Sequence, residues 1–311
     1  MSQKLALVFP GQGSQTVGML ADLYAEYDVV RDTFAESSAA LGYDLWQLVA
    51  NGPEADLNET HRTQPALLTA SVAIWRLWQQ QGGATPDYLA GHSLGEYSAL
   101  VCAGVLSLGD AVSLVEKRGQ YMQTAVPAGT GAMSAIIGLD DALIAKACDE
   151  AAQGEVVSPV NFNSPGQVVI AGNKAAVERA NELCKAAGAK RALPLPVSVP
   201  SHCALMKPAA AQLATDLASM SFNVPTFAVV NNVDVAIAAD ETAVKDALVR
   251  QLYSPVRWTE TIEWLSAQGV TQVVEIGAGK VLNGLVKRIN RDLEVSSVND
   301  LASFKAAFAA E

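Results

Sequence analysis

Short apolar runs alternate along this chain with longer stretches in which apolar residues recur every three or four positions. The first run, Lys4 to Phe9, is apolar after its first residue, as in a strand buried on both faces of a parallel sheet. The spacing in the longer stretches predicts amphipathic helices. Strands that alternate with helices predict an α/β fold whose mostly parallel sheet is covered on both faces.

Most of the chain follows this alternation. Strands are expected at 4–9, 88–90, 226–231, 272–276 and 295–298. Helices are expected at 19–41, 43–51, 65–81, 96–101, 111–125, 205–220, 244–252, 259–268, 280–289 and 301–309. The third of these helices is predicted to begin at Pro65, because proline suits the first turn of a helix.

The pattern changes between residues 128 and 197. Strands at 131–138, 156–161, 167–171 and 190–195 surround helices at 142–152 and 174–187. This order, βαββαβ, is that of a ferredoxin-like unit. The sequence therefore predicts a large α/β-hydrolase-like domain, 1–127 and 198–311, into which a small ferredoxin-like subdomain, 128–197, is inserted.

Composition narrows the class of protein. The chain has 311 residues, of which 50% are hydrophobic and 17% charged, so a folded globular protein is expected. Its net charge of −11 argues against nucleic acid as a partner. No apolar run approaches the ~20 residues of a membrane span, and no signal peptide precedes the first strand. A protein that is not bound to membranes is expected.

The four cysteines are scattered and include no Cys-x-x-Cys pair. They are Cys102, Cys148, Cys184 and Cys203. Neither a disulfide framework nor a metal site is expected from this spacing, which favours a cytoplasmic location.

The segment Gly91-His92-Ser93-Leu94-Gly95 carries the strongest candidate chemistry. It follows an apolar strand and precedes a helix, which is the arrangement of a nucleophile elbow. There the serine hydroxyl is exposed at a tight turn, and the N-terminus of the new helix offers free N–H groups to an oxyanion. The alternative is a turn whose glycines are only steric and whose serine only caps the helix.

A glycine-rich loop, Pro10 to Gln15, follows the first strand. Its glycine spacing does not fit a dinucleotide fingerprint, since the next glycine is Gly18, and no Gly-Lys-Ser/Thr follows. Loops at the carboxyl ends of parallel strands form the sites of α/β proteins. The loop is therefore predicted to be a second wall of the site, with Gln12 as a candidate oxyanion donor.

Arg118 lies on the apolar face of its predicted helix, four residues from both Leu114 and Met122. A charge on a buried face needs a partner. The pattern leaves two interpretations open: an internal salt bridge or a long side chain that reaches the surface, and a guanidinium that binds a substrate carboxylate.

An activated serine needs a base, and the chain has three histidines. His61 lies among polar neighbours and is expected at the surface. His92 is adjacent to Ser93 in a sharp turn and is expected to point away. His202, which follows a proline-containing loop, is the favoured base. It precedes the C-terminus by about a hundred residues and has no acidic neighbour, unlike the histidine of an α/β-hydrolase, so an uncharged carbonyl or amide is expected to orient it.

Several segments together resemble one family. They are Gly11-Gln12-Gly13-Ser14-Gln15, Gly91 to Tyr97, Arg118, Asn161 to Gln167 and Pro200-Ser201-His202. Over essentially the whole chain they are similar to the malonyl-CoA:acyl carrier protein transacylases of bacterial type II fatty acid synthesis. One departure is that Gly277-Ala278-Gly279 stands where the family often has Gly-Pro-Gly. This affects the stiffness of a loop more than the chemistry.

The resemblance implies a ping-pong acyl transfer. Ser93 would take the malonyl group from malonyl-CoA, with His202 as base, and pass it to the phosphopantetheine thiol of acyl carrier protein. Arg118 would bind the malonyl carboxylate. The implied partners are acyl carrier protein and malonyl-CoA or CoA; no permanently bound cofactor and no metal are implied, and nothing demands more than a monomer.

Five further residues receive roles from the resemblance. Backbone N–H groups of Gln12 and Leu94 would form the oxyanion hole. Gln251 would orient His202 through a main-chain carbonyl. Met122 and Asn161 would line the substrate pocket.

Two other functions share parts of this pattern. A serine esterase or thioesterase would use Ser93 and His202 but has no need of Arg118. A non-catalytic carrier-binding protein would need none of the three.

Overall fold

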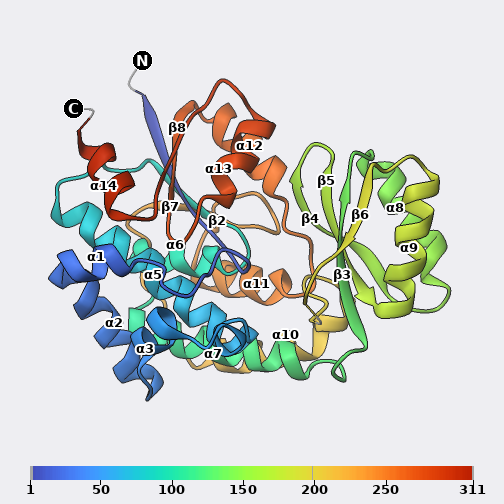
Figure 1. Ribbon diagram of the computed structural model, residues 1–311, viewed down its shortest axis with the longest axis horizontal. Coiled ribbons are helices and arrows are strands. Elements are labelled where there is room, and N and C mark those ends of the chain that lie inside the picture. The colour runs from blue at the N-terminus through green and yellow to red at the C-terminus, as the bar shows by residue number, and fades with distance from the viewer. Residues whose placement is uncertain (1–2, 198, 310–311) are drawn as a thin grey trace.

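The larger of two sheets is entirely parallel. The computed structural model describes residues 3–197 and 199–309. Across this sheet the strands are β7 (Ala228–Val230), β2 (Tyr88–Gly91), β1 (Lys4–Phe9), β8 (Val270–Ile276) and β9 (Glu294–Val298) (Figure 1). Phe9 and Gly91 pair at the carboxyl ends of β1 and β2, so the loops that follow these strands begin side by side. The predicted mostly parallel sheet is confirmed.

Strand β1 supplies side chains to both faces of this sheet. Leu5, Leu7 and Phe9 belong to the core on one face, and Ala6 and Val8 to the core on the other. Alternation of side chains along a strand explains this division. The first core is completed by α5 (Thr60–Gln80), α6 (Gly95–Cys102) and α7 (Leu108–Thr124), and the second by α12 (Trp258–Ala267) and α13 (Val281–Ile289). Helices therefore cover both faces, as predicted.

All but two of the remaining helices add residues to the first core. They are α1 (Ala21–Glu26), α2 (Asp28–Leu41), α3 (Leu45–Asn51), α4 (Glu54–Leu57), α10 (Lys207–Ala218) after a short 3₁₀ turn (Ala204–Met206), α11 (Glu241–Gln251) and α14 (Leu301–Phe308).

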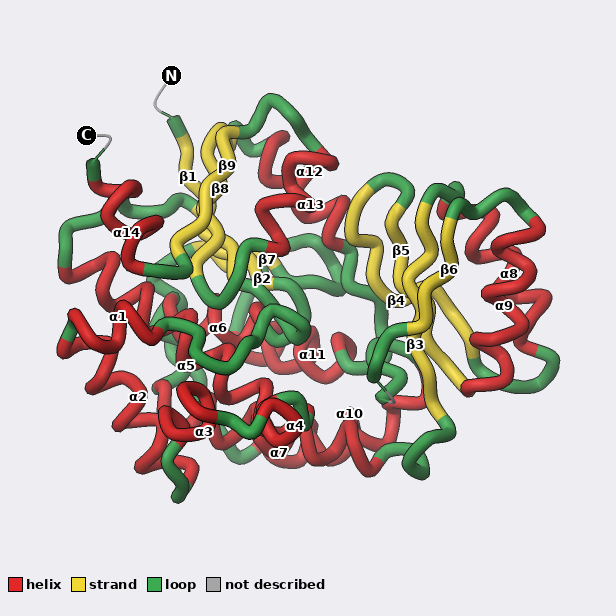
Figure 2. Tube along the Cα trace, viewed as in Figure 1, coloured by secondary structure: helices red, strands yellow, loops and turns green. Residues whose placement is uncertain are grey.

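A second sheet is antiparallel and lies to one side (Figure 2). Its strands, in order, are β4 (Val157–Ser164), β5 (Gln167–Asn173), β3 (Gly131–Ile137) and β6 (Arg191–Pro194), with α8 (Asp141–Ala152) and α9 (Lys174–Ala186) packed on it. The predicted βαββαβ order is present. The exact boundaries, 128 and 197, stay a prediction. Hydrogen bonds from Val256 N to Val160 O (2.8 Å) and from Phe162 N to Val256 O (3.0 Å) tie this sheet to the segment before α12.

Two helix predictions are wrong in detail. The expected helix 19–41 is two helices, because Tyr27 has an extended backbone (φ −120°, ψ 125°) between them. The helix expected to begin at Pro65 begins at Thr60. Pro65 removes one backbone donor near that end of the helix, and the long buried stretch after it offsets the loss.

Among the described residues, no helix is both long and apolar enough to cross a membrane.

Candidate active site

Ser93 lies in the tight turn between β2 and α6, as the elbow motif predicts. Its backbone is left-handed (φ 52°), a conformation that costs energy for a residue with a side chain. A Cβ on Gly91 would lie 1.9 Å from the Gly95 carbonyl carbon, and one on Gly95 would lie 2.1 Å from the Phe9 oxygen. Only glycine at both positions allows this turn to pack against β1.

Asn232 holds the turn from a third strand. It follows β7, and its side chain accepts a hydrogen bond from Ser93 N (2.8 Å) and donates one to Gly91 O (2.7 Å). Asn232 was not predicted from the sequence. Its position just beyond the carboxyl end of a parallel strand was the available signal.

The Ser93 hydroxyl meets the ring of His202. Ser93 Oγ lies 2.7 Å from His202 Nε2, and His202 Nδ1 lies 2.7 Å from the main-chain oxygen of Gln251. A carbonyl oxygen only accepts, so Nδ1 carries the ring proton and Nε2 is left as an acceptor for the serine O–H. The backbone of His202 is also left-handed (φ 64°).

Burial and the nearby Arg118 charge lower the pKa of His202 to about 3. The ring is therefore neutral at neutral pH, which is the form that can accept a proton. Among the described residues no carboxylate contacts this ring, and the Gln251 carbonyl takes the orienting place.

The other two histidines lie elsewhere. His92 Nε2 bonds to Asn163 Oδ1 at 2.7 Å, away from the serine. His61 is partly buried rather than fully at the surface, and its Nδ1 lies 2.8 Å from Gln123 Oε1. Neither ring forms a hydrogen bond with Ser93 Oγ in the described structure.

Arg118 is almost completely buried, with 1% of its surface exposed, and its guanidinium faces the serine. Nη1 donates to Gln64 Oε1 (2.8 Å) and Nη2 to Gln251 Oε1 (2.9 Å), while Nη2 lies 3.5 Å from Ser93 Oγ. No carboxylate among the described residues forms a salt bridge with it, and Nε has no hydrogen-bond partner. Both alternatives to a ligand-binding role, the internal salt bridge and the side chain that reaches the surface, are therefore absent from this part of the molecule.

Burial lowers the pKa of Arg118 from its usual value, but an arginine stays protonated in proteins. The site thus contains a buried positive charge whose protein partners are two neutral amides. Such a charge favours an anion, and the guanidinium keeps N–H groups free for one. Gln64 was not foreseen from sequence, because nothing local distinguishes it from other glutamines.

The Gln12 and Leu94 backbone N–H groups have no hydrogen-bond partner among the described residues. They come from the two loops that begin side by side after β1 and β2. Leu94 starts the turn that leads into α6. Free N–H groups at such a turn can stabilise a negatively charged oxygen.

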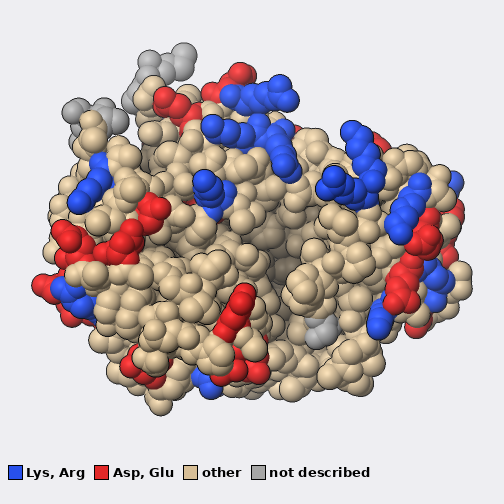
Figure 3. All heavy atoms as spheres, viewed as in Figure 1, with Lys and Arg blue, Asp and Glu red and all other residues tan. Residues whose placement is uncertain are grey.

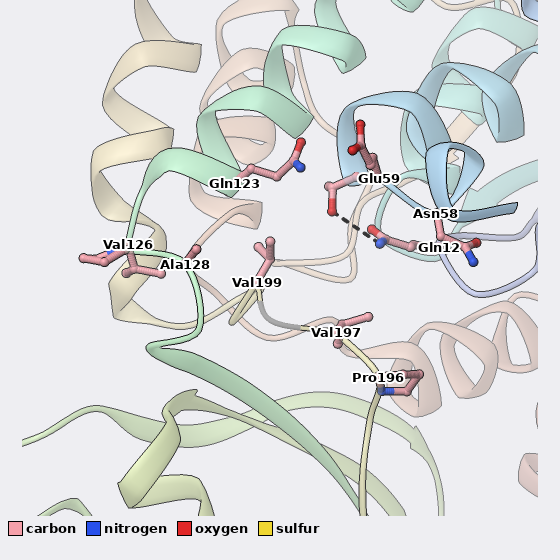
Figure 4. Close-up of a pocket in the computed structure, with 12 residues that line it drawn as sticks. Gln12, Asn58, Glu59, Gln123, Val126, Ala128, Pro196, Val197 and Val199 are labelled. Atoms are coloured by element: carbon pink, nitrogen blue, oxygen red, sulfur yellow. Dashed lines mark hydrogen bonds between the residues drawn. The ribbon is translucent and has the colours of Figure 1, made fainter. Parts of the chain in front are cut away.

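A cavity of about 290 Å³ opens beside Gln12. Figure 4 shows Gln12, Asn58 and Glu59 on one side of it and Val126 and Ala128 on the other, with Val199 between them and Pro196 below. Gln12 Nε2 lies 3.5 Å from Thr60 Oγ1. The cavity provides room for an elongated group next to the proposed oxyanion hole.

The two remaining pocket candidates differ. Met122 lies one turn beyond Arg118 on α7, is 2% exposed, and its sulfur accepts a hydrogen bond from Gln64 Nε2 (3.5 Å). Asn161 lies on β4 beside Val256, and its buried Oδ1 has no partner among the described residues. Asn161 makes no hydrogen bond to Ser93, His202 or Arg118 in the described structure. No group of His, Cys, Asp and Glu suited to hold a metal ion occurs within residues 3–197 and 199–309.

Known proteins resemble this chain over nearly its whole length. The profile of the acyl transferase domain family matches residues 6–304. The chain is 68% identical over 304 residues to the malonyl CoA-acyl carrier protein transacylase of Salmonella typhimurium, covering 98% of both. A crystal structure of an acyl carrier protein S-malonyltransferase from Vibrio cholerae is 70% identical, with a TM-score of 0.96 over 98% of this chain and 99% of that one.

A second solved structure contains a type II PKS acyl-carrier protein in complex with its malonyl-transacylase. Its chain is 64% identical to this one, with a TM-score of 0.98 over 99% of this chain and 100% of that one. Sequence and structure thus agree, and the chain belongs to the acyl transferase domain family.

Proposed function

We propose that this enzyme transfers the malonyl group of malonyl-CoA to the phosphopantetheine thiol of an acyl carrier protein, through a malonyl ester of Ser93. The observation that carries the proposal is the buried Arg118 guanidinium, which faces the Ser93 hydroxyl and has no carboxylate partner among the described residues. The names of the relatives support the same substrates.

In the first half-reaction, Ser93 Oγ attacks the thioester carbonyl carbon while His202 Nε2 takes the hydroxyl proton. The 2.7 Å contact between these atoms supports direct transfer. The Gln251 carbonyl stabilises the ring, now charged, through Nδ1–H. The C–S bond then breaks, and His202 returns the proton to the CoA thiolate.

The negative oxygen of the tetrahedral intermediate is assigned to the backbone N–H groups of Gln12 and Leu94. Their lack of another partner in the described structure supports this role. Loss of one such donor costs about 3 kcal/mol in other enzymes, so the pair is a substantial part of the catalysis.

Arg118 selects malonyl over acetyl by charge. Acetyl would leave the buried guanidinium without an anion, at a cost of a few kcal/mol. The bound carboxylate also activates the base, because the Arg118 charge is one cause of the low pKa of His202. Neutralising that charge raises the pKa of His202 and makes Nε2 a stronger base. Met122 and Asn161 are proposed to line this pocket.

In the second half-reaction, the phosphopantetheine thiol gives its proton to His202 and attacks the malonyl ester. The ester C–O bond then breaks, and His202 returns the proton to Ser93 Oγ. The cavity beside Gln12 is proposed to hold the pantetheine arm of either partner. Exclusion of water from the ester is the property that would distinguish this transferase from a hydrolase.

Acyl carrier protein is proposed to dock on exposed cations near this cavity. Figure 3 shows Lys and Arg side chains gathered above a hollow in the surface, over α12, α13 and the neighbouring edge of the small sheet. Lys287 and Arg288 lie in the last turn of α13, and Arg288 Nη1 bonds to Gln167 Oε1 of β5 (2.6 Å). Lys287→Glu and Arg288→Glu should raise the KM for carrier protein and leave that for malonyl-CoA unchanged; equal effects on both would overturn this docking site.

A thioesterase is the alternative. It is not favoured, because hydrolysis gives Arg118 no role and the relatives are transacylases. A cytoplasmic location, a monomeric state and the absence of a permanent cofactor are also proposed; four free, buried cysteines fit a reducing compartment.

Intact-mass measurement after brief mixing with malonyl-CoA tests the function. We expect a malonyl adduct that Ser93→Ala abolishes and that holo acyl carrier protein removes. Steady release of CoA and malonate without carrier protein would indicate a hydrolase. The absence of both an adduct and CoA release would contradict the enzymatic proposal.

A further inference from the structure

Glu96 is a buried carboxyl beside the site that the proposed mechanism does not use. It lies in the first turn of α6 and is 2% exposed. Its Oε2 accepts hydrogen bonds from Asn232 N (3.0 Å) and from Gln251 Nε2 (2.9 Å). It forms no salt bridge with any described Lys or Arg.

The Gln251 side chain lies between Glu96 and Arg118. Its oxygen accepts from Arg118 Nη2 (2.9 Å), and its nitrogen donates to Glu96 Oε2 (2.9 Å) and to Ser93 O (3.0 Å). Amide oxygen toward the cation and amide nitrogen toward the carboxyl is the orientation that both groups favour. Glu96 and Arg118 are thus connected through one oriented amide.

We propose that Glu96 is the resting counter-ion of Arg118, connected through the Gln251 amide, and that the substrate carboxylate takes over this role when it binds. The inference rests on the proposed malonyl transfer. A direct Glu96–Arg118 pair would occupy the N–H groups that the substrate needs. With the Gln251 amide between them, Glu96 partly balances the charge of Arg118 while the Arg118 N–H groups stay free.

This exchange predicts proton uptake. Burial raises the pKa of Glu96 to about 7, although the hydrogen bonds from Asn232 and Gln251 and the Arg118 charge lower it. A malonyl carboxylate on Arg118 cancels the positive charge that stabilises ionised Glu96, so its pKa rises further and it binds a proton from solvent. A cavity of about 20 Å³ beside Glu96 has room for one water that can supply the proton.

The other titratable groups nearby do not account for such an uptake. Asp234 is paired with Arg250 and has a lowered pKa. Tyr97 has a pKa raised to about 12 by burial, and the pKa values of His202 and His92 are lowered by burial. All of these shifts move a pKa away from neutrality, whereas burial raises the pKa of Glu96 to about 7.

Calorimetric titration of the Ser93→Ala protein with malonyl-CoA and with acetyl-CoA, in two buffers of different ionisation enthalpy, tests this exchange. The CoA part is common to both ligands, and the malonyl carboxylate is already ionised at neutral pH. A difference in proton uptake between the two ligands therefore comes from the protein. At about pH 7.5, just above the pKa of Glu96, we expect a fraction of a proton to be taken up with malonyl-CoA and none with acetyl-CoA. In the enzyme with Ser93 intact, the KM for malonyl-CoA should rise between pH 6 and pH 9, because binding favours protonated Glu96. The rise should be about tenfold for each unit by which binding raises the pKa of Glu96.

Glu96→Gln removes the charge and keeps an oxygen for Asn232 N and Gln251 Nε2, so both effects should disappear. Glu275→Gln is the matched control, since Glu275 is also fully buried with a pKa raised to about 7, but it bonds to Leu282 N and Asn283 N on α13. Equal proton uptake for the two ligands would overturn the inference and leave malonyl transfer standing. Failure of malonyl-CoA to bind would overturn both. The two-ligand comparison needs no change at Glu96, so it stays decisive if Glu96→Gln does not fold.

Discussion

Two arginines beside the C-terminal end of α11 have opposite surroundings. Arg250, on α11, is 33% exposed in its side chain, pairs with both oxygens of Asp234 (2.8 Å each) and bonds to Asp246 (2.7 Å). Arg118 is buried, and its short hydrogen bonds go to the amide oxygens of Gln64 and Gln251 rather than to carboxylates. The pKa of Arg250 is raised by its carboxylates, and that of Arg118 is lowered by burial.

This is the difference expected between a structural cation and a cation that binds a ligand, the role proposed for Arg118. Carboxylates neutralise Arg250 and leave it nothing further to bind. Amides hold Arg118 in place without neutralising it, so its charge stays available to a ligand. A buried charge without a direct carboxylate partner is costly, and its persistence indicates a use outside stability.

The largest expected effect comes from Arg118→Met, which keeps the length and removes the charge. We expect kcat/KM for malonyl-CoA to fall about a thousandfold, equivalent to about 4 kcal/mol, because the carboxylate loses its buried partner. The acetyl-CoA value should stay the same or rise. Arg250→Ala is the control and should change both values less than twofold. An equal loss of kcat/KM with both substrates would mean that Arg118 does not recognise the carboxylate.

Gln64→Leu should have the next largest effect. It leaves Arg118 Nη1 without its acceptor, a cost of about 1 to 3 kcal/mol, and lets the guanidinium shift. Malonyl-CoA kcat/KM should fall about tenfold to a hundredfold. Gln120→Leu changes an exposed glutamine on α7, the helix of Arg118, and should have no effect. Equal activity of the two variants would remove Gln64 from the site.

Arg118→Met should also stabilise the protein. Removing a buried charge that has no direct carboxylate partner should raise the free energy of unfolding by about 1 to 2 kcal/mol, measured by urea denaturation without substrate. A decrease would show that Arg118 holds the fold together, as a structural arginine does.

The smallest expected effect is that of Arg250→Ala on stability. Its ion pairs are partly exposed, so the free energy of unfolding should fall by less than about 1 kcal/mol, and less still at high salt. A loss of several kcal/mol with disturbed activity would indicate that Arg250 positions Gln251 as well.

Local patterns were enough to predict much of the fold and part of the site. The apolar run of β1, the elbow around Ser93 and the charge of Arg118 on an apolar helix face are all readable within a few residues. His202 followed from a count of three histidines and its loop. The interrupted helix at Tyr27 and the early start of α5 were missed, because tertiary packing overrides the helical pattern there.

The residues that hold the catalytic side chains in place could not be predicted in the same way. Gln64, Glu96 and Asn232 come from three segments that only the fold brings together. Glu96 was visible as a neighbour of the elbow, but its burial was not. Gln251 was predicted only from the resemblance, because every residue type has a main-chain carbonyl that could orient a histidine.

The most direct test of the account is an experimental structure of the protein with malonyl on Ser93. We expect the malonyl carboxylate within hydrogen-bond distance of the Arg118 guanidinium, with the contacts to Gln64 and Gln251 kept and the ester carbonyl facing the N–H groups of Gln12 and Leu94. A carboxylate that points to solvent or to another cation, with Arg118 unchanged, would contradict the proposed basis of malonyl selection.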